Sequence, residues 1–450
     1  MDGRRERRPG GCEAGCGAQT SLDAIAQSAR RNKKKRYRSL YSFLNHVCLE
    51  RAYHALNKRA AAGVDRVSWN DYGENLKENL LDLEERLKTK RYRAKWVRRV
   101  FIPKGNDKVR PLSIPAIEDK IVQYVVKEIL EALFEALFLD TSFGYRKKRS
   151  PRQAVERLRD ELNQKCTWVV EADISSFFDT IDRDWLVKML ERRVNDRSLI
   201  RLIEKWLRAG VLQPDGSVNH PERGTAQGST LSPVPANIYL HFVLDQWFSH
   251  EMGSIFTGRA VLVKYADDFV AGFRYHTVAS RFLRALKQRL EKFGLSLAPE
   301  KTRKFMFNRF NLERSETFEF LGFEYRRSVA RSGRDYMSLR TSRKKLRKIT
   351  AQFTEWCKGV RNKRLRWIMP MVKSKLTELK NYFGVGGNWR SIREIRMIFK
   401  RILFKWLNRR SERKSFNWST FDGMLRFYNV LGYEHIRNEG VQLSFLSKPA

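Results

Sequence analysis

Three aspartates have the residue types and surroundings that could do chemistry. Asp267 and Asp268 are adjacent, at a predicted turn between two apolar strands at 260–265 and 269–273. Two neighbouring carboxylates in a half-buried place repel each other, and one takes up a proton unless a cation lies there. Asp173 ends an earlier apolar run in the same manner. Three carboxylates converging from two strands suit a pair of Mg²⁺ ions, because this hard cation prefers oxygen ligands. Ions about 3.5–4 Å apart can activate an attacking hydroxyl and stabilise a leaving group in phosphoryl transfer.

Each of these features also has a purely structural explanation. Asp-Asp is common in turns, and an acid at the end of an apolar run occurs by chance in a long chain. The combination favours the catalytic interpretation. Tyr265-Ala266-Asp267-Asp268 lies between two apolar strands, and Asp173 closes an earlier strand at a suitable distance along the chain.

The elements that must position these acids predict a mixed α+β fold. An amphipathic helix is expected over 40–56, and helices dominate from residue 76 to about 210. Two predicted strands, at 97–103 and 168–174, interrupt those helices. Beyond the two strands around the Asp-Asp turn, alternating apolar residues predict one more strand over 318–325.

The composition indicates a polyanionic partner. The 450 residues include 90 Lys and Arg against 50 Asp and Glu, a formal net charge of +40, and 42% are hydrophobic, enough for two or three domains. This excess favours nucleic acid over a membrane, because no run approaches the roughly 18 apolar residues of a spanning helix. The basic, polar start does not read as a secretory signal, which favours an intracellular protein. Five cysteines without a Cys-x-x-Cys pair, and seven histidines without ligand spacing, argue against a zinc module.

The positive charge is concentrated toward the C-terminus. Residues 326–415 contain 28 Lys and Arg against five Asp and Glu, and three helical patterns run through them at about 341–358, 363–383 and 390–411. In the third, the apolar residues form one stripe, and Arg393 lies largely off it. A basic bundle with an ordinary core is one interpretation; a nucleic-acid-binding bundle is favoured because the charge bias is regional.

The motifs around the aspartates resemble those of reverse transcriptases. Lys264-Tyr265-Ala266-Asp267-Asp268-Phe269-Val270 is similar to the active-site hairpin of that family, and the segment 171–181 is similar to its first catalytic strand. Further blocks stand in the family's order: Phe101–Lys104 with Arg110–Pro115, Ser142–Arg146 with Arg149, Gly224–Gly228 with Leu231–Pro233 and Ala236–Leu240, Leu297–Thr302, and Phe320–Phe323. The whole series, over roughly residues 38–425, resembles bacterial group II intron reverse transcriptases, the maturases. The stretches 381–385 and 406–411 resemble their thumb, or maturase domain X.

The resemblance implies a right-hand polymerase of fingers, palm and thumb, with an antiparallel palm sheet and a basic helical thumb. The expected parts are a flexible basic arm at 1–36, an N-terminal extension at 37–75, fingers and palm at 76–330, a thumb or domain X at 331–425, and a C-terminal tail at 426–450. The charge run at 30–36 is equally compatible with an RNA-gripping arm and with a solvated tail.

The resemblance also implies a role for individual residues. Asp173, Asp267 and Asp268, with the Ile174 carbonyl, would hold two Mg²⁺ ions. Lys104 and Arg110 would hold the triphosphate of a deoxynucleotide, Phe178 would exclude a 2′-hydroxyl, and Gln227 would lie against the nucleotide and the templating pair. Six further cations would contact RNA or template: Arg146, Arg149, Lys301, Arg393, Arg409 and Arg410. The alternatives remain open: Phe178 as core, Lys104 and Arg110 as surface charges, Gln227 as a turn residue.

Several residues depart from the family's pattern. The family usually has Pro at the position of Ala226 and Pro-Gly at Lys147-Lys148, and Gly at the positions of Arg66, Ser113 and Ser229. Losing a glycine where φ is positive costs on the order of 1 kcal/mol, and losing a proline loosens a turn. These changes could mean a specialised relative, or one whose polymerase is weakened while RNA binding persists.

Three functions follow from the resemblance. The leading one is an RNA-directed DNA polymerase that copies an RNA template from a DNA primer, binds group II intron RNA to promote splicing, and primes at a DNA target for retrohoming. The alternatives are a non-catalytic RNA-binding splicing factor and a domesticated reverse transcriptase serving defence. We expect no endonuclease module and no membrane, and a bacterial cytoplasmic, nucleoid-associated location; the sequence leaves the oligomeric state open.

Overall fold

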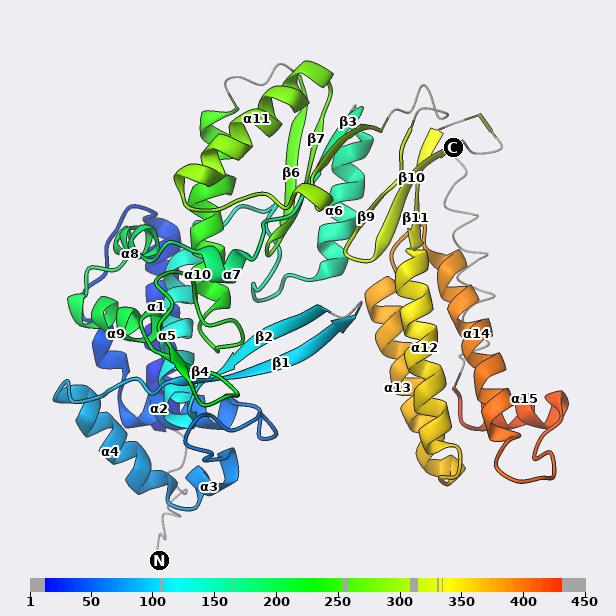
Figure 1. Cartoon of the computed structure of the whole chain (residues 1–450), viewed down its shortest axis with the longest axis horizontal. Helices are drawn as coiled ribbons and strands as arrows, with labels where there is room; N and C mark the ends of the chain where they lie inside the picture. The colour runs from blue at the N-terminus through cyan, green and yellow to red at the C-terminus, as the bar shows by residue number, and fades with distance from the viewer. Residues whose placement is uncertain are drawn as a thin grey trace, which may run out of the picture.

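The computed structural model describes residues 13–105, 108–164, 166–253, 258–307, 315–329, 332–333 and 335–430. For residues 13–20, 104–105, 108 and 335, it describes the backbone only. The fold mixes helices with three separate β-sheets, as an α+β fold should (Figure 1). Within the described ranges, every helix is too short or too polar to cross a membrane.

A four-stranded antiparallel sheet carries the aspartates. Its strands lie in the order β6 (Ala260–Tyr265), β7 (Asp268–Phe273), β3 (Trp168–Ala172) and β8 (Arg303–Met306). This confirms the predicted antiparallel sheet. It also confirms the two strands around the Asp-Asp turn.

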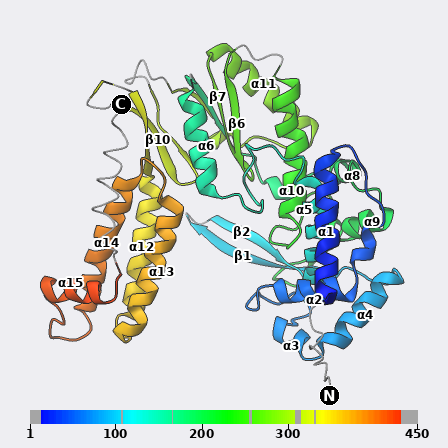
Figure 2. The ribbon, with the colours of Figure 1, turned by 180° about the vertical axis from the view of Figure 1, so that it is seen from behind.

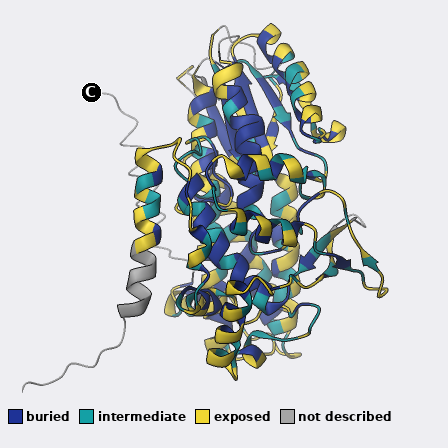
Figure 3. Ribbon diagram, turned by 90° about the vertical axis from the view of Figure 1, so that its left-hand side faces the viewer, coloured by how far each residue is buried: buried dark blue, intermediate teal, exposed yellow. Residues whose placement is uncertain are grey.

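Alternate residues of these strands face two different cores. Val170 and Ala271 belong to one apolar cluster together with residues of α11 (His276–Lys292), while Val169 and Val270 belong to a second together with residues of α6 (Pro151–Asn163). Successive side chains of a strand point to opposite faces, so this sheet is covered on both sides. Figure 3 shows the buried residues gathered along these strands and on the inner faces of the surrounding helices.

The N-terminal half forms a helical lobe around a second sheet. The sheet has the order β2 (Lys108–Ile114), β1 (Val97–Gly105), β4 (Val211–Leu212) and β5 (Val218–Asn219). Strand β1 continues past Pro103, where the sequence predicted its end. The remaining helices of the lobe and its junction with the sheet are α2 (His46–Ala55), α3 (Trp69–Gly73), α4 (Leu76–Lys88), α5 (Ile117–Phe134), α7 (Phe177–Thr180), α8 (Arg183–Glu191), α9 (Arg197–Leu207) and α10 (Pro233–Leu240).

The single helix predicted over 40–56 is wrong. A 3-10 turn, Leu40–Phe43, comes first, and α2 begins only at His46. Asn45 caps α2, because its side-chain oxygen accepts a bond from the Cys48 N–H at 3.0 Å. The cap starts a new helix in place of the continuous one that the apolar spacing predicted.

The prediction of a flexible arm at 1–36 is wrong for the described residues 13–36. Helix α1 (Glu13–Arg31) lies alongside α5 and reaches α2, with Leu22 and Ala29 buried (Figure 2). The buried Arg193 donates to the carbonyls of Asn32 at 2.9 Å and Ala29 at 3.3 Å. These contacts order the chain that leads into the lobe. Residues 1–12 lie outside the described residues.

A third sheet joins the four-stranded sheet to a helical bundle. It contains β9 (Phe318–Phe320), β10 (Phe323–Val329) and β11 (Asp335–Thr341) in antiparallel order. The single strand predicted over 318–325 is therefore two strands, which turn at Leu321 (φ 51) and Gly322 (φ 79). The boundary predicted between residues 330 and 331 falls between β10 and β11, which pair with each other along their length.

The bundle contains α12 (Arg343–Val360), α13 (Leu365–Phe383), α14 (Trp389–Leu407) and α15 (Trp418–Phe427). The three predicted helices are therefore confirmed to within a few residues at their ends. The apolar stripe of α14 is buried, and its Phe399 stacks on Phe353 of α12 with ring centres 3.6 Å apart.

Asn388 fastens the bundle to the third sheet. Its side chain is fully buried, accepts the backbone N–H of Thr341 at 2.8 Å, and donates to the Thr341 hydroxyl and the Phe383 carbonyl. One amide thus joins the end of β11, the end of α13 and the start of α14. All of its polar atoms have partners, which makes the joint specific as well as stable.

Candidate active site

The turn between β6 and β7 holds the paired aspartates. Tyr265 pairs with Asp268, so Ala266 and Asp267 form the two-residue tip, and Ala266 takes a left-handed φ of 57. The tip rests on Gly144, where even a Cβ atom would clash with the Ala266 backbone nitrogen. Gly144 therefore allows the close approach that fixes the height of the tip.

Asp173 lies at the same edge of the sheet. Strand β3 is the neighbour of β7, and Ala172 pairs with Phe269, so Asp173 leaves β3 beside Asp268. Asp173 and Asp268 both line one pocket of about 490 Å³. Two backbone bonds, from Ala298 N–H to the Asp173 carbonyl (2.8 Å) and from Ser175 N–H to the Ser296 carbonyl (2.9 Å), hold the chain on both sides of Ile174.

The negative charge of Asp173 acts on both aspartates of the hairpin. Asp268 is solvent-exposed at the pocket, yet the surrounding protein, and then the charges of Asp267 and Asp173, raise its pKa to about 6. Burial and Asp173 raise the pKa of Asp267 as well, while Arg110 and Lys301 oppose that shift. Mutual repulsion of this kind is relieved by a cation, so the donor set suits a hard divalent ion.

Lys301 supplies a cation to this group. Its ammonium forms an ion pair with Asp173, and the same bond, followed by the charge of Asp268, raises the pKa of Lys301. Among the described residues, no three Asp, Glu, His or Cys side chains stand together as a ready metal site. The Lys301 ammonium occupies one carboxylate oxygen of Asp173.

Two of the residues predicted for the nucleotide meet through one loop. The Phe178 carbonyl accepts the Thr225 N–H at 2.7 Å, and the Gln227 carbonyl accepts the Ser113 N–H at 2.7 Å. Gly224 permits this contact, because a Cβ there would lie 2.8 Å from the Phe178 carbonyl oxygen. The loop 224–228 is therefore held between α7, which follows Asp173, and strand β2.

Arg110, also on β2, lies within electrostatic reach of the aspartates. Burial and then Asp267 raise the pKa of Tyr145, and Arg110 opposes that shift as it does for Asp267. Lys104 lies in β1, but its side chain is outside the described residues. Of the two predicted cations, Arg110 is thus placed near the acids.

The departures from the family's pattern have structural counterparts. Lys148 and Arg66 take left-handed φ values of 62 and 58, the conformation for which glycine is suited. Ser113 is buried, and its hydroxyl has no partner among the described residues. Ser232 donates to the Ala226 carbonyl at 2.7 Å. The backbone keeps these turns, and non-glycine residues carry the strain.

Arg146 is not available to RNA, which corrects the prediction. Its side chain is 3% exposed. It donates to Glu135 at 2.7 Å, to the Leu139 carbonyl at 2.7 Å and to the Ser142 carbonyl at 2.5 Å. This guanidinium stabilises the turn that leads to Gly144. No local pattern predicts that role, because the partner Glu135 lies at the end of the preceding helix.

The other predicted RNA contacts divide into two groups. Near the sheet, Arg149 is paired with Asp140 at 2.5 Å, and Lys301 with Asp173. On the bundle, Arg393 and Arg409 are exposed. Arg410 is half-buried, and its pKa is lowered by burial.

Tyr382 is a site residue that the sequence reasoning named only within a motif. Its hydroxyl donates to the Leu321 carbonyl at 3.1 Å. Burial, and then Tyr265 and Asp268, raise its pKa, so the ring stands close to the hairpin. Tyr382 lies in the last turn of α13, within electrostatic reach of Asp268.

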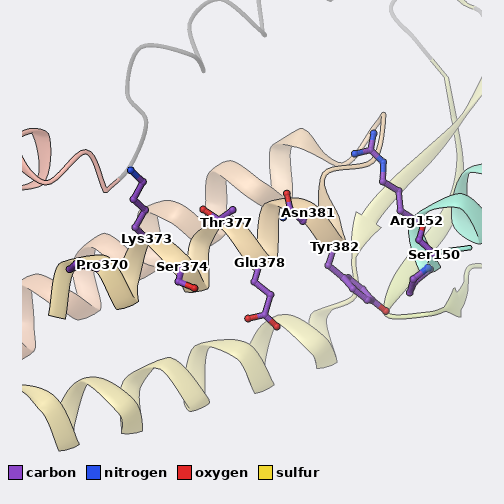
Figure 4. Close-up of a pocket in the computed structure, with 10 residues that line it drawn as sticks. Ser150, Arg152, Pro370, Lys373, Ser374, Thr377, Glu378, Asn381 and Tyr382 are labelled. Carbon is purple, nitrogen blue, oxygen red and sulfur yellow. The ribbon is translucent and has the colours of Figure 1, made fainter. Parts of the chain in front are cut away.

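A larger pocket, of about 830 Å³, opens between α13 and the start of α6. Figure 4 shows its side chains along α13, with Ser150 and Arg152 near the end of the row where Asn381 and Tyr382 lie. The lining residues on α13 are Pro370, Lys373, Ser374, Thr377, Glu378, Asn381 and Tyr382. Since Tyr382 also stands near the hairpin, this groove leads toward the aspartates.

Comparison with known proteins agrees with this geometry. Residues 102–325 match the family model described as reverse transcriptase (RNA-dependent DNA polymerase). The chain is 33% identical to Protein YkfC of Escherichia coli (strain K12) over 239 residues, 46% of this chain and 62% of YkfC. It is 33% identical to the group II intron-encoded protein LtrA of Lactococcus lactis subsp. cremoris over 222 residues, 49% of this chain and 37% of LtrA. A shorter match, 33% over 94 residues, is to nuclear intron maturase 1, mitochondrial, of Arabidopsis thaliana (21% of this chain, 13% of that protein).

Residues 102–325 therefore belong to the reverse transcriptase family. Relatives of the chain include a group II intron-encoded protein and an intron maturase, which confirms the resemblance recognised from the motifs. The chain spans less than two thirds of the length of these curated relatives, for example 62% of YkfC and 37% of LtrA.

Proposed function

We propose that this protein is an RNA-directed DNA polymerase. One observation carries the proposal: Asp267 and Asp268 lie at the end of the β6–β7 hairpin, and Asp173 leaves the adjacent strand beside them. Asp173 and Asp268 line one pocket, and the charge of Asp173 raises the pKa of both Asp267 and Asp268. Acids grouped in this way are expected where a cation is held for phosphoryl transfer. The family match supports the same reaction class.

Asp173, Asp267 and Asp268 would hold two Mg²⁺ ions, with the Ile174 carbonyl beside them. When bound, the ions would lower the pKa of the primer's 3′-hydroxyl and neutralise charge on the leaving pyrophosphate. Lys301 would have to release Asp173 for this to occur, and its ammonium would remain next to the reacting phosphates. Arg110, with Lys104, would bind the triphosphate of the deoxynucleotide.

The loop 224–228 and α7 would form the rest of the nucleotide pocket. The Phe178 ring would lie under the sugar and exclude a 2′-hydroxyl, and Gln227 would contact the nucleotide and the templating base. The shared backbone bonds between this loop, α7 and β2 support a single rigid pocket. Rigid support is what such positioning requires.

In this proposal the lobe around β1 and β2 is the fingers, the four-stranded sheet the palm, and the bundle from α12 onward the thumb or domain X. An RNA template paired with its DNA primer would lie in the groove between α6 and α13. The hydroxyl and amide groups of Ser374, Thr377 and Asn381 suit a sugar–phosphate backbone, and Lys373 adds a cation.

A second function, intron RNA binding that promotes splicing and retrohoming at a DNA target, is supported by the names of the relatives and by the basic bundle. A catalytically weak splicing factor on the same scaffold is the alternative. Two features favour it: the left-handed Lys148, and the buried Ser113 hydroxyl, which has no partner among the described residues. Both belong to motifs of the proposed nucleotide and template path.

The test compares primer extension on an RNA template by the wild type, Asp267→Asn and Glu300→Gln. We expect Asp267→Asn to lower the rate by about 10³-fold or more, since it removes a fixed charge at the reacting centre. Glu300→Gln is the matched control: it neutralises an exposed acid in the wall of the same pocket and should stay within a few-fold of wild type. RNA affinity should be unchanged in both. A wild type that extends no primer with Mg²⁺ and deoxynucleotides, yet binds RNA, would establish the binding-only alternative.

A further inference from the structure

A buried ion pair lies directly beneath the aspartate hairpin. Lys264 precedes Tyr265 in β6, and its Nζ is 2.9 Å from Oδ2 of Asp245. The two side chains are 1% and 3% exposed. Asp245 ends a short π-helical turn, His241–Asp245, that continues α10. Neither residue has a part in the proposed reaction.

Two further charged or polar side chains act on the pair. The Nδ1 of His241, itself fully buried, lies 3.8 Å from the same Asp245 oxygen. The charge of Arg146 opposes protonation of Lys264. Although burial acts to raise the pKa of Asp245, Lys264 and His241 hold it below its usual value. The free energy of hydration that two buried charges lose can exceed what their attraction returns, so such a pair contributes little to the free energy of unfolding. A role in fixing the position of the neighbouring strand explains it better.

Lys264 is held from its backbone as well as from its side chain. Its N–H donates to the Thr141 carbonyl at 2.9 Å, and its carbonyl accepts the Phe143 N–H at 2.9 Å. The chain then passes under the hairpin tip at Gly144, whose carbonyl accepts a bond from the Asn237 side chain at 2.7 Å. The end of β6 is therefore fixed on one side by the segment 141–144 and on the other by Asp245.

Arg146 secures that segment from below. Its bonds to the carbonyls of Leu139 and Ser142, and to Glu135, close the turn that presents Thr141 and Phe143 to Lys264. The supports converge on a stretch of chain that ends three residues later in Asp267. Lys264 is one residue, a rise of about 3.3 Å, before Tyr265, which pairs with Asp268 across the turn. A shift at Lys264 is therefore transmitted directly to the turn that carries the carboxylates.

We propose that Lys264 is a positioning residue, whose buried pair with Asp245 sets the height and direction of Asp267 and Asp268. The inference rests on the proposed polymerase function for its kinetic consequence, but its structural consequence does not. Displacements of about 1 Å at a reacting group can cost on the order of 10²-fold in rate. A pair that served stability alone would be replaceable by any neutral pair that packs as well.

The central experiment is therefore the double variant D245N/K264M, which replaces both charges with neutral groups of similar size. We expect a melting temperature within a few degrees of wild type and unchanged RNA affinity. The rate at saturating deoxynucleotide should fall at least tenfold, with KM for the nucleotide within twofold. Mn²⁺ binding, followed by electron paramagnetic resonance, should weaken, and amide exchange over residues 262–270 should speed up.

K264R is the conservative variant, since it keeps a buried cation opposite Asp245, and should recover most of the lost rate. K400M/D422N is the matched control. It removes a second Lys–Asp pair, with Nζ and Oδ1 2.6 Å apart, from the bundle; its Lys400 is buried and its Asp422 is one third exposed. This control should leave Mn²⁺ binding and the exchange of residues 262–270 unchanged.

The proposal is overturned if D245N/K264M keeps its rate, its Mn²⁺ affinity and its exchange pattern within twofold of wild type. If that variant does not fold, D245E carries the same test, because it retains the charge and moves it by one methylene. An inactive wild type would count against the polymerase and not against the positioning role, since exchange and Mn²⁺ binding decide that role without turnover.

Discussion

The aspartate sheet and the helical bundle use charge in opposite ways. Around the sheet, three charged pairs have at least one buried or largely buried member: Asp173 with Lys301, Arg146 with Glu135, and Lys264 with Asp245. On the bundle, Arg393 and Arg409 face solvent.

The difference reflects two kinds of work. Chemistry on one bond requires a few groups held to within a fraction of an ångström, and interior partners hold them there. Binding a long polyanion requires positive charge over a surface, and the affinity depends on how many phosphates are met rather than on any single geometry. Burying a charge therefore indicates positioning here, and exposing one indicates binding.

The largest effect on stability should follow from breaking an interior cation. Arg146→Met removes a buried, fully bonded guanidinium and should lower the free energy of unfolding by about 3–4 kcal/mol. Arg393→Met, on the bundle surface, should change it by less than about 0.5 kcal/mol. Urea denaturation of both variants measures the contrast. A stable Arg146→Met protein with weakened RNA binding would instead restore the original interpretation of Arg146 as an RNA contact.

A second test concerns an interior acid of the N-terminal lobe. Asp119 is 2% exposed; burial raises its pKa to about 6, while a hydrogen bond from the Tyr92 hydroxyl opposes the shift. A raised carboxyl pKa means that the folded state holds the proton more tightly, so stability from this group is present at low pH and is lost as pH rises from about 4 through 6. The full change amounts to about 3 kcal/mol.

Asp119→Asn should abolish that dependence. The stability of wild type relative to this variant should rise by about 3 kcal/mol between pH 7.5 and pH 4. Tyr92→Phe should move the transition to higher pH, because it removes the donor that favours the ionised form. If the free energy of unfolding varies with pH in the same way for wild type and Asp119→Asn, the prediction is wrong and the pKa of Asp119 is not raised by folding.

The smallest effect per residue should come from the bundle. Arg390, Arg393 and Arg401 are exposed along α14, and R390Q/R393Q/R401Q should weaken RNA binding by about tenfold at physiological salt. The slope of log affinity against log salt should become shallower by about 2–3, since roughly 0.7–0.9 is lost per phosphate contact. Glu394→Gln, on the same exposed side, should instead strengthen binding slightly. An unchanged salt slope would remove α14 from the RNA surface.

Much of the architecture could be predicted from the sequence. The β6–β7 hairpin, strand β3 and the three long helices of the bundle each have a strong local pattern, and all appear in the structure close to their predicted ends. Local pattern failed where a single residue decides the geometry. Asn45 restarts the helix at His46, and the left-handed Leu321 divides the predicted strand 318–325 in two.

The grouping of the three acids could be predicted from the sequence, but the side chains that pair with the charges around them could not. The types and spacing of Asp173, Asp267 and Asp268 marked them as a group. By contrast, nothing local links Lys301 to Asp173, 128 residues away, or Lys264 to Asp245. A charged side chain can as well be buried in a pair as left at the surface, and sequence spacing alone does not separate these outcomes. That is why Arg146 was assigned to RNA.

The buried amide of Asn388 has a mechanical consequence. Its hydrogen bonds connect α13 and the start of α14 to the end of β11. The bundle and the three-stranded sheet should therefore move as one unit. The Tyr382 hydroxyl bonds the Leu321 carbonyl, so α13 is also joined to the β9–β10 turn. Leu321 lines the pocket of Asp173 and Asp268, so a displacement of the bundle would reach that pocket through these bonds.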